Sequence, residues 1–201
     1  QLLIDVKTNV NIRYKLPNGK GRHTALQLAA ARGHTAIVQM LVDAKANVEA
    51  SGGTSRPLHS AAREGHVGVA QILINAKVDV NSKCELGHTP LKLASERGDS
   101  DLVKLLFSAG ARVTDKAVKS ATAEGHIDTM RLLIENRGCI GAALCAAAGV
   151  GDLKTMQMLI DEYKVRDTGI FDYLCGKALA DAAENGQSDA VQFLLDAQAN
   201  V

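Results

Sequence analysis

The spacing of apolar residues along the chain repeats six times around a glycine. Each copy has a short stretch rich in small or apolar residues, then the glycine, then a longer stretch whose apolar residues fall on one helical face, as Ile37, Val38 and Leu41 do. An apolar residue stands seven positions before each glycine, an alanine four before it, and another apolar residue eight after it. The glycines are Gly33, Gly65, Gly98, Gly125, Gly151 and Gly186. The pattern predicts six units, each made of a short helix, a glycine turn and a longer helix.

Residues that favour helix starts stand just before two of the short stretches. Thr24 and Thr89 are candidate N-caps, because a threonine hydroxyl accepts a hydrogen bond from a free backbone N–H of the first turn. Pro90 follows Thr89 at a first-turn position, where the missing N–H of proline breaks no helical bond. The alanine column lets neighbouring helices approach closely. These features predict an all-α fold.

The intervals between the turn glycines are unequal. They are 32, 33, 27, 26 and 35 residues in chain order. The two short intervals predict that two connections between units are abbreviated. Gly110 ends the third long helix, whereas Lys45, Lys77 and Gln198 stand at the equivalent positions of other units. If these three residues adopt a left-handed backbone conformation, each costs about 1 kcal/mol relative to glycine.

Two stretches of the chain carry a recognisable signature. Residues 88–98 read HTPLKLASERG and residues 56–66 read RPLHSAAREGH. Both resemble the T-P-L-H-x-A-A-x-x-G-H signature of the ankyrin repeat, and the resemblance extends through all six copies. It implies an all-α, ankyrin-repeat solenoid of antiparallel helix pairs with β-hairpin fingers, some of which are shortened. The departures are a lost threonine in several copies and a signature histidine kept only as His59.

The resemblance also implies a domain organisation. We expect a single ankyrin-repeat domain over residues 1–201, with residues 1–11 forming the end of a partial repeat ahead of the six copies. Because both ends of the chain stop inside a repeat, we expect the domain to be part of a longer array.

Composition and charge narrow the function classes. Hydrophobic residues make up 46% and charged residues 22%, which suits a folded domain with a buried core. The net charge of +1 argues against a nucleic-acid partner, which needs many unopposed Lys and Arg side chains. Residues 138–151 form the longest uncharged run, too short for membrane insertion.

Four cysteines without a CxxC pair favour a cytoplasmic protein with reduced thiols, with the nucleus as the alternative.

Motifs for catalysis, metals and cofactors were sought along the chain. The six histidines all fall at repeat positions, where capping or contact with a neighbouring loop explains them better than metal binding. No P-loop, dinucleotide-binding fingerprint or GxSxG sequence occurs. We therefore expect no enzyme activity, no catalytic residues, no metal and no cofactor.

Candidate partner-binding residues follow from the resemblance. Ankyrin-like arrays generally contact partners through a concave face made by the fingers and the exposed ends of the short helices. The positions just before the turn glycines give Arg32, Arg63, Glu64, Glu96, Arg97, Glu124, Glu184 and Asn185, and the fingers add Tyr14, Lys15 and Leu86. For any one of these residues, simple solvation of a surface side chain is the alternative explanation.

The first finger is longer than the third and unusually basic. It carries Arg13, Tyr14, Lys15, Lys20 and Arg22 with no acidic residue. A tyrosine between basic residues suits an anchor for an acidic peptide, and a flexible polar loop is an equal alternative.

These observations favour a non-catalytic scaffold for protein–protein interaction, which binds a protein or peptide on its concave face. The alternative is a structural spacer or regulatory arm within a larger multidomain protein, engaged in intramolecular contact with flanking domains.

The repeat pattern yields a stability prediction for Leu91. Replacing Leu91 with alanine removes a large side chain from a predicted core column, so the free energy of unfolding should fall by about 2–5 kcal/mol. Urea denaturation followed by circular dichroism measures the change. Leu86→Ala, on a predicted finger, is the control and should change it by less than about 0.5 kcal/mol. Equal effects of the two substitutions would contradict the repeat alignment.

Overall fold

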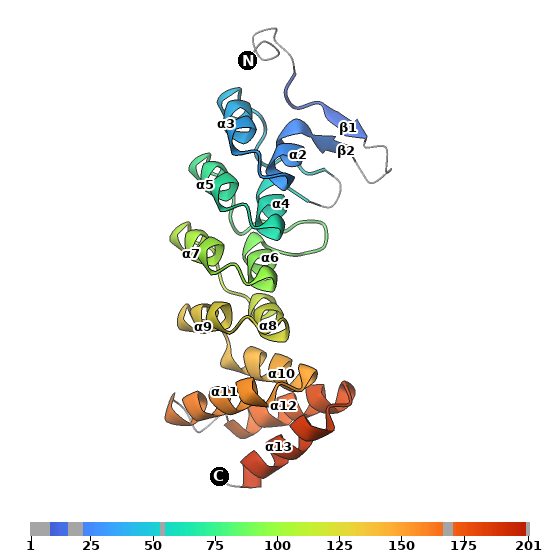
Figure 1. Cartoon of the computed structure of the whole chain (residues 1–201), viewed down its shortest axis with the longest axis vertical. Helices are drawn as coiled ribbons and strands as arrows, with labels where there is room; N and C mark the ends of the chain where they lie inside the picture. Colours follow the sequence, from blue (N-terminus) through green and yellow to red (C-terminus); the bar gives the residue numbers. More distant parts are fainter. Residues whose placement is uncertain (1–8, 16–21, 53–54, 167–170, 200–201) are drawn as a thin grey trace. The chain divides into compact units, whose positions relative to one another are not determined.

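The computed structural model describes residues 9–15, 22–52, 55–166 and 171–199 (Figure 1). Residues 1–8 of the expected partial repeat lie outside this part of the chain. The described residues form twelve helices and one two-stranded sheet, so the predicted all-α repeat fold is confirmed. The chain divides into two compact units, residues 1–112 and 113–201.

The first unit contains a hairpin and three helix pairs. Its elements are β1 (Arg13–Lys15), β2 (Arg22–Thr24), α2 (Ala25–Ala31), α3 (Thr35–Asp43), α4 (Pro57–Glu64), α5 (Val67–Asn75), α6 (Pro90–Arg97) and α7 (Ser100–Ser108). The first helices of the pairs, α2, α4 and α6, pack in one row, and the second helices, α3, α5 and α7, pack in another (Figure 1). Each pair therefore buries its apolar faces against its neighbours in the unit.

The second unit contains three further helix pairs. They are α8 (Asp115–Ala123) with α9 (Ile127–Glu135), α10 (Ile140–Val150) with α11 (Leu153–Arg166), and α12 (Phe171–Glu184) with α13 (Ser188–Ala199). Helix α10 packs against both α8 and α12, and α11 packs against α13.

The predicted helix starts are present. The Thr24 hydroxyl accepts a hydrogen bond from the Gln27 N–H, and the Gln27 side chain accepts one from the Thr24 N–H, which completes a capping box. Thr89 accepts a hydrogen bond from the Lys92 N–H at the start of α6, where Pro90 occupies the first turn. Local sequence thus fixes where these two helices begin.

The aligned apolar and alanine columns form the core. Every member of the alanine column is buried, as are the apolar residues that follow the turn glycines by eight positions. In the column seven positions before the glycines, Leu179 alone is half-buried, while its equivalents, such as Leu58 and Leu91, are almost fully enclosed. The positions that align in sequence therefore occupy the core in each helix pair.

The connections between the first five helix pairs have two lengths, as the glycine intervals predict, whereas the longest interval, from Gly151 to Gly186, is filled by two helices of 14 residues. Residues 44–56 and 76–89 form long connections, of which the first contains an isolated bridge between Gly52 and Ser55 and the second a turn closed by the Gly87 N–H on the Cys84 carbonyl. Residues 109–114 and 136–139 are short connections. Among the described residues, the finger before α2 is the one that forms a paired hairpin.

Several long helices end at a residue with a left-handed backbone. Lys45 and Lys77 have φ angles of 60° and 64°, and Gly110 has 86°. Arg137 occupies the same position in the fourth pair with φ of 71°, which the sequence reading overlooked. Gln198 instead lies within α13. A cation at the end of a helix interacts favourably with the helix dipole, which offsets part of the backbone strain.

The left-handed conformation of Lys77 gives a stability prediction. Lys77→Gly and Lys77→Ala both remove the charge, but only glycine adopts this conformation without strain. The glycine variant should therefore be more stable by about 1 kcal/mol. Chemical denaturation of both variants measures the difference.

Lys83 provides the matched control, because it is an exposed loop lysine outside the left-handed region. There the order should reverse, with Lys83→Gly less stable than Lys83→Ala by about 0.5–1 kcal/mol. If the glycine and alanine variants had the same order of stability at both positions, Lys77 would not have the left-handed backbone conformation.

Candidate protein-binding surface

The ends of the first helices place charged side chains side by side in the first unit. Arg63 and Glu64 end α4, while Glu96 and Arg97 end the adjacent α6. Arg63 is half-buried, and the other three side chains are exposed. The Lys92 Nζ lies 2.7 Å from a Glu96 carboxylate oxygen, an ion pair one helical turn apart. These helices thus carry a mixed polar band, as the repeat alignment predicts.

Arg97 is held close to the turn of the preceding repeat. A Cβ atom added to Gly65 would overlap the Arg97 side chain, which would then have to shift. Gly65 also has a left-handed φ of 76°, which a glycine adopts without strain. In the same way the His66 ring lies over Gly33, with its Nε2 atom 3.3 Å from the Ala31 carbonyl oxygen. These glycines therefore bring side chains of one repeat onto the turn of the one before.

The hairpin finger has two different faces. Its register pairs Arg13 with Thr24, Tyr14 with His23, and Lys15 with Arg22. Because side chains alternate along a strand, Tyr14 points to the face opposite that of its two basic neighbours. Tyr14 is 59% exposed, and Lys15 is exposed as well. Tyr14 and the basic residues therefore cannot all contact one flat ligand surface. Lys20 lies outside the described residues.

Other sequence-predicted residues lie apart from this band. Leu86 is 56% exposed on the turn between Cys84 and Gly87. Arg32 is exposed at the end of α2. In the second unit, Glu124 follows α8 and Glu184 ends α12, so α10 lies between the helices that carry them.

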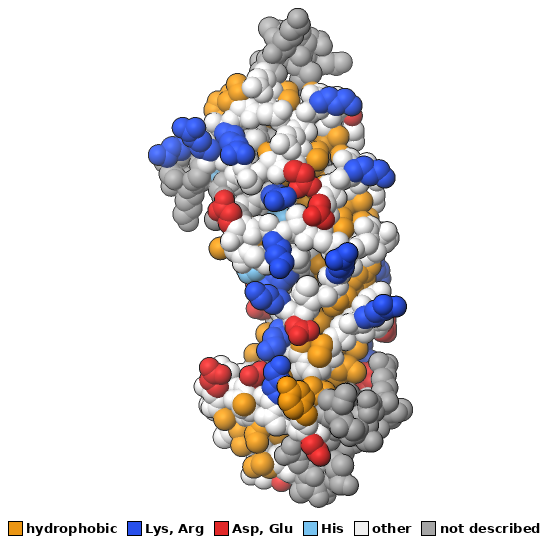
Figure 2. Space-filling view, turned by 180° about the vertical axis from the view of Figure 1, so that it is seen from behind, with side chains coloured by type: hydrophobic (Ala, Val, Ile, Leu, Met, Phe, Trp, Pro, Cys, Tyr) orange, Lys and Arg blue, Asp and Glu red, His pale blue; other side chains and the backbone are white. Residues whose placement is uncertain are grey.

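Asn185, also in the second unit, donates a hydrogen bond from its side chain to the Asp181 carbonyl, which caps α12. Figure 2, which shows the side opposite to Figure 1, has basic and acidic side chains interspersed over the first unit.

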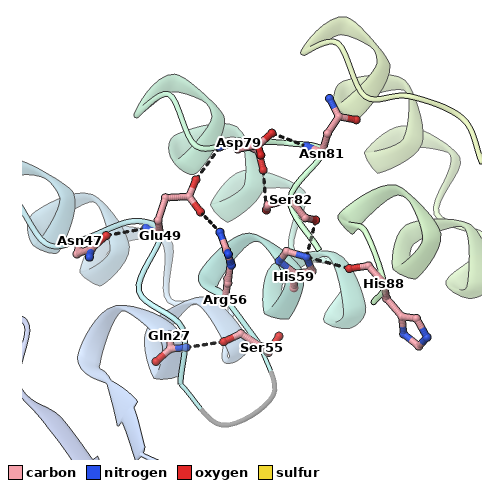
Figure 3. A network of polar contacts seen from close by, with 10 residues as sticks. All are labelled: Gln27, Asn47, Glu49, Ser55, Arg56, His59, Asp79, Asn81, Ser82 and His88. Atoms are coloured by element: carbon pink, nitrogen blue, oxygen red, sulfur yellow. Dashed lines mark hydrogen bonds and ion pairs between the residues drawn. The ribbon is translucent and has the colours of Figure 1, made fainter. Parts of the chain in front are cut away.

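Buried side chains tie two of the first helices, α2 and α4, to the connections that follow them (Figure 3). His59 is fully buried, and its Nε2 atom lies 3.0 Å from the Ser82 carbonyl oxygen and 3.1 Å from that of His88. Since carbonyl oxygens only accept, Nε2 carries the hydrogen. Gln27, at the equivalent position of the preceding repeat, donates from its Nε2 atom to the carbonyls of Gly52 and Ser55. The His59 imidazole and the Gln27 amide thus both donate hydrogen bonds to carbonyl groups of the connection that follows their helix.

A second set of hydrogen bonds links the connections of successive repeats. A side-chain oxygen in one connection accepts a backbone N–H of the next, with N···O distances of 2.7–2.8 Å. The three links run from Asn47 to Asn11, from Asp79 to Glu49 and from Arg112 to Asn81. We call these links the inter-repeat ladder. Glu49 also forms an ion pair at 2.8 Å with Arg56 of its own connection, so its carboxylate holds both that connection and the next one (Figure 3).

Comparison with known proteins identifies the family. A family model described as ankyrin repeats (3 copies) matches residues 1–84 and 53–117, more than half of the chain. The chain belongs to the ankyrin-repeat family. Ankyrin repeats generally serve as protein–protein interaction modules.

Two known proteins illustrate the likeness. The chain is 32% identical over 191 residues to an ankyrin repeat and KH domain-containing protein of Caenorhabditis briggsae, with 87% of this chain aligned. It spans only 6% of the length of that relative. The crystal structure of the human ASB11 ankyrin repeat domain superposes with a TM-score of 0.71 at 23% identity, covering 87% of this chain and 84% of that chain.

Metal ligands, apolar helices and thiols bear on what other chemistry this ankyrin-repeat chain supports. The described residues contain no group of three or more His, Cys, Asp or Glu side chains placed to hold a metal ion. Within the same residues no helix is long and apolar enough to cross a bilayer. Burial, with a contribution from Asp181, raises the pKa of the Cys145 thiol to about 11, so this cysteine stays protonated at neutral pH.

Sequence reasoning missed parts of these ankyrin repeats. It assigned His59 a structural role, which the structure confirms, but it did not recognise Gln27 as the equivalent donor. It also did not assign Glu49 to the ladder. The available signal was the alignment itself, because Gln27 and His59 stand at the same distance from their turn glycines.

His59 generates a prediction about pH. Burial lowers its pKa, outweighing the opposite effect of its two backbone hydrogen bonds. Below pH about 6.5 the unfolded chain therefore binds a proton that the folded chain does not, and the free energy of unfolding falls as the pH drops. The slope from this one group approaches about 1.4 kcal/mol per pH unit.

His59→Gln is the matched variant, because it installs the amide donor that Gln27 provides one repeat earlier. Urea denaturation at several values between pH 7 and pH 5.5 should show a smaller decrease in the free energy of unfolding for the variant than for the parent chain. Identical slopes would show that His59 does not cause the pH dependence.

Proposed function

We propose that the chain is a non-catalytic module that binds a protein or peptide through its fingers and the ends of its first helices, the concave face of the repeat array. The observation that carries this proposal is the exposure of Tyr14 and Leu86 on two fingers of the first unit. Neither side chain contributes to the buried core, and both are large enough to anchor a partner. Tyrosine and arginine are also the residue types most enriched among energetically dominant interface contacts.

The charges on the helix ends support a protein partner rather than a nucleic acid. Arg63 and Arg97 alternate with Glu64 and Glu96, so the band offers donors and acceptors of both signs. Such mixed charges favour specificity for one complementary protein surface. A nucleic acid requires many unopposed cations instead. Arg32 belongs to the same proposed set in the first unit. In the second unit, considered by itself, the proposed residues are Glu124, Glu184 and Asn185.

A regulatory arm or spacer in a larger protein is the second candidate. It is favoured by the small share, 6%, of the curated relative that this chain spans. In that arrangement the same surface contacts a flanking domain of its own polypeptide. We place the module in the cytoplasm, with the nucleus as the alternative, because four cysteines without paired spacing suit a reducing compartment.

Affinity capture from eukaryotic cell lysate with quantitative mass spectrometry tests the proposal. The baits are the parent chain, Arg63→Glu/Arg97→Glu, Tyr14→Ser/Leu86→Ser, and the control Lys104→Glu/Arg112→Glu. The control reverses two exposed charges of the same unit outside the fingers and first helices. A true partner should be retained by the parent and the control, and reduced by at least about tenfold with either surface variant.

Thermal melts of all four baits confirm that each is folded, since exposed substitutions usually change stability by less than about 0.5 kcal/mol. Equal recovery of the same proteins by all four baits would contradict binding through this face and favour the spacer or regulatory arm.

A further inference from the structure

The hairpin presents three cations on a single face. Arg13 and Lys15 are two residues apart on β1, so their side chains point to the same side. Arg22 stands directly opposite Lys15 on β2, and directly paired residues share a face. We call Arg13, Lys15 and Arg22 the basic face of the hairpin. Figure 2 shows Lys and Arg side chains gathered on this projecting finger, at the upper left.

These cations lack compensation within the described part of the chain. All three residues are exposed, and none of them takes part in the ion pairs found among the described residues. Like charges directly opposite each other weaken a two-stranded sheet. The fold thus gains nothing from the pairing of Lys15 with Arg22, whereas an anionic ligand would relieve the repulsion.

Neighbouring elements leave one edge of the hairpin open. A Cβ atom added to Gly52 would overlap the Arg22 carbonyl oxygen, so the following connection lies directly against β2. Strand β1 pairs with β2 alone within the described residues. A ligand that reaches the basic face therefore has access along β1.

We propose that the basic face binds an extended acidic segment of a protein partner. This inference rests on the proposed function and names the chemistry of the partner. Side chains two residues apart on a strand are separated by about 7 Å, which equals the repeat of alternate side chains in an extended peptide. Glutamate or aspartate at alternate positions can then meet Arg13 and Lys15, and Arg22 lies beside the same path.

The number of cations favours a peptide over a nucleic acid. Phosphate backbones are bound by several cations spread over many nucleotides, and each contact adds to a steep salt dependence. The basic face offers three cations, whereas on the next fingers the charges balance, since Glu49 pairs with Arg56 and Lys83 stands near Glu85 in the sequence. The charge pattern therefore fits a short acidic segment.

Fluorescence anisotropy with a labelled peptide of four alternating Glu-Thr pairs tests the proposal, with the Gln-Thr peptide as the uncharged probe. The test variant is Arg13→Gln/Lys15→Gln/Arg22→Gln. The matched control is Lys77→Gln/Lys104→Gln/Arg112→Gln, which removes the same charge from exposed positions of the same unit. The parent should bind the Glu-Thr peptide at least about tenfold more tightly than the test variant does, and the control should bind within about twofold of the parent.

Three results would overturn the inference. Equal weakening in both triple variants would mean that net charge alone attracts the peptide. If the parent chain bound the Gln-Thr peptide as tightly as the Glu-Thr peptide, the carboxylates would not contribute to binding. Tighter binding of an eight-nucleotide RNA, lost in the test variant, would make a nucleic acid the ligand.

The outcome is separable from that of the proposed function. If the peptide fails to bind while capture from lysate still depends on Arg63 and Arg97, the proposed function is supported and the inference about the basic face is wrong. If the peptide binds specifically but the Arg63→Glu/Arg97→Glu variant still captures the same proteins, the basic face binds acidic segments and the helix ends take no part in binding.

Discussion

Hydrogen bonds from side chains of one repeat to backbone groups of the next hold the connections of the first unit in place. Connection backbones have no helical partner for their N–H and C=O groups, and leaving such groups unpaired is costly. The inter-repeat ladder pairs three of the N–H groups, and Gln27 and His59 pair carbonyls on the finger side. Because a repeat contacts only its neighbours, these bonds set where each finger stands relative to the previous helix.

The exposed band depends on this arrangement. Tyr14 and Leu86 stand on two of the fingers of this unit, and both side chains are exposed. At the helix ends, the Arg97 side chain of α6 lies against Gly65, the turn that follows α4. Small residues inside the helices and glycines at the turns thus bring charged side chains of different repeats onto one surface.

The repeat alignment predicted much of the fold. The glycine, alanine and leucine columns located the helix pairs, Thr24 and Thr89 marked two helix starts, and the unequal intervals located the short connections. The candidate surface was harder to predict because it depends on contacts between repeats. The opposite orientation of Tyr14 and its basic neighbours follows from hairpin register, which becomes definite only when the pairing of β1 with β2 is known. Arg137 was missed although the alignment carried the signal, because it follows Gly125 by twelve residues, as Lys45 and Lys77 follow their own turn glycines.

The ladder has a consequence for how such chains evolve. Its three acceptor side chains, on Asn11, Glu49 and Asn81, meet residues as different as Asn47, Asp79 and Arg112, because only the main-chain N–H of the receiving residue is used. Any residue except proline supplies that donor. Two receiving side chains have a task of their own, because the Asn47 and Asp79 side-chain oxygens accept the N–H groups of Glu49 and Asn81, the residues that carry the next acceptors. A repeat can therefore be duplicated, lost or exchanged with its joint intact as long as a short acceptor side chain is kept at that position.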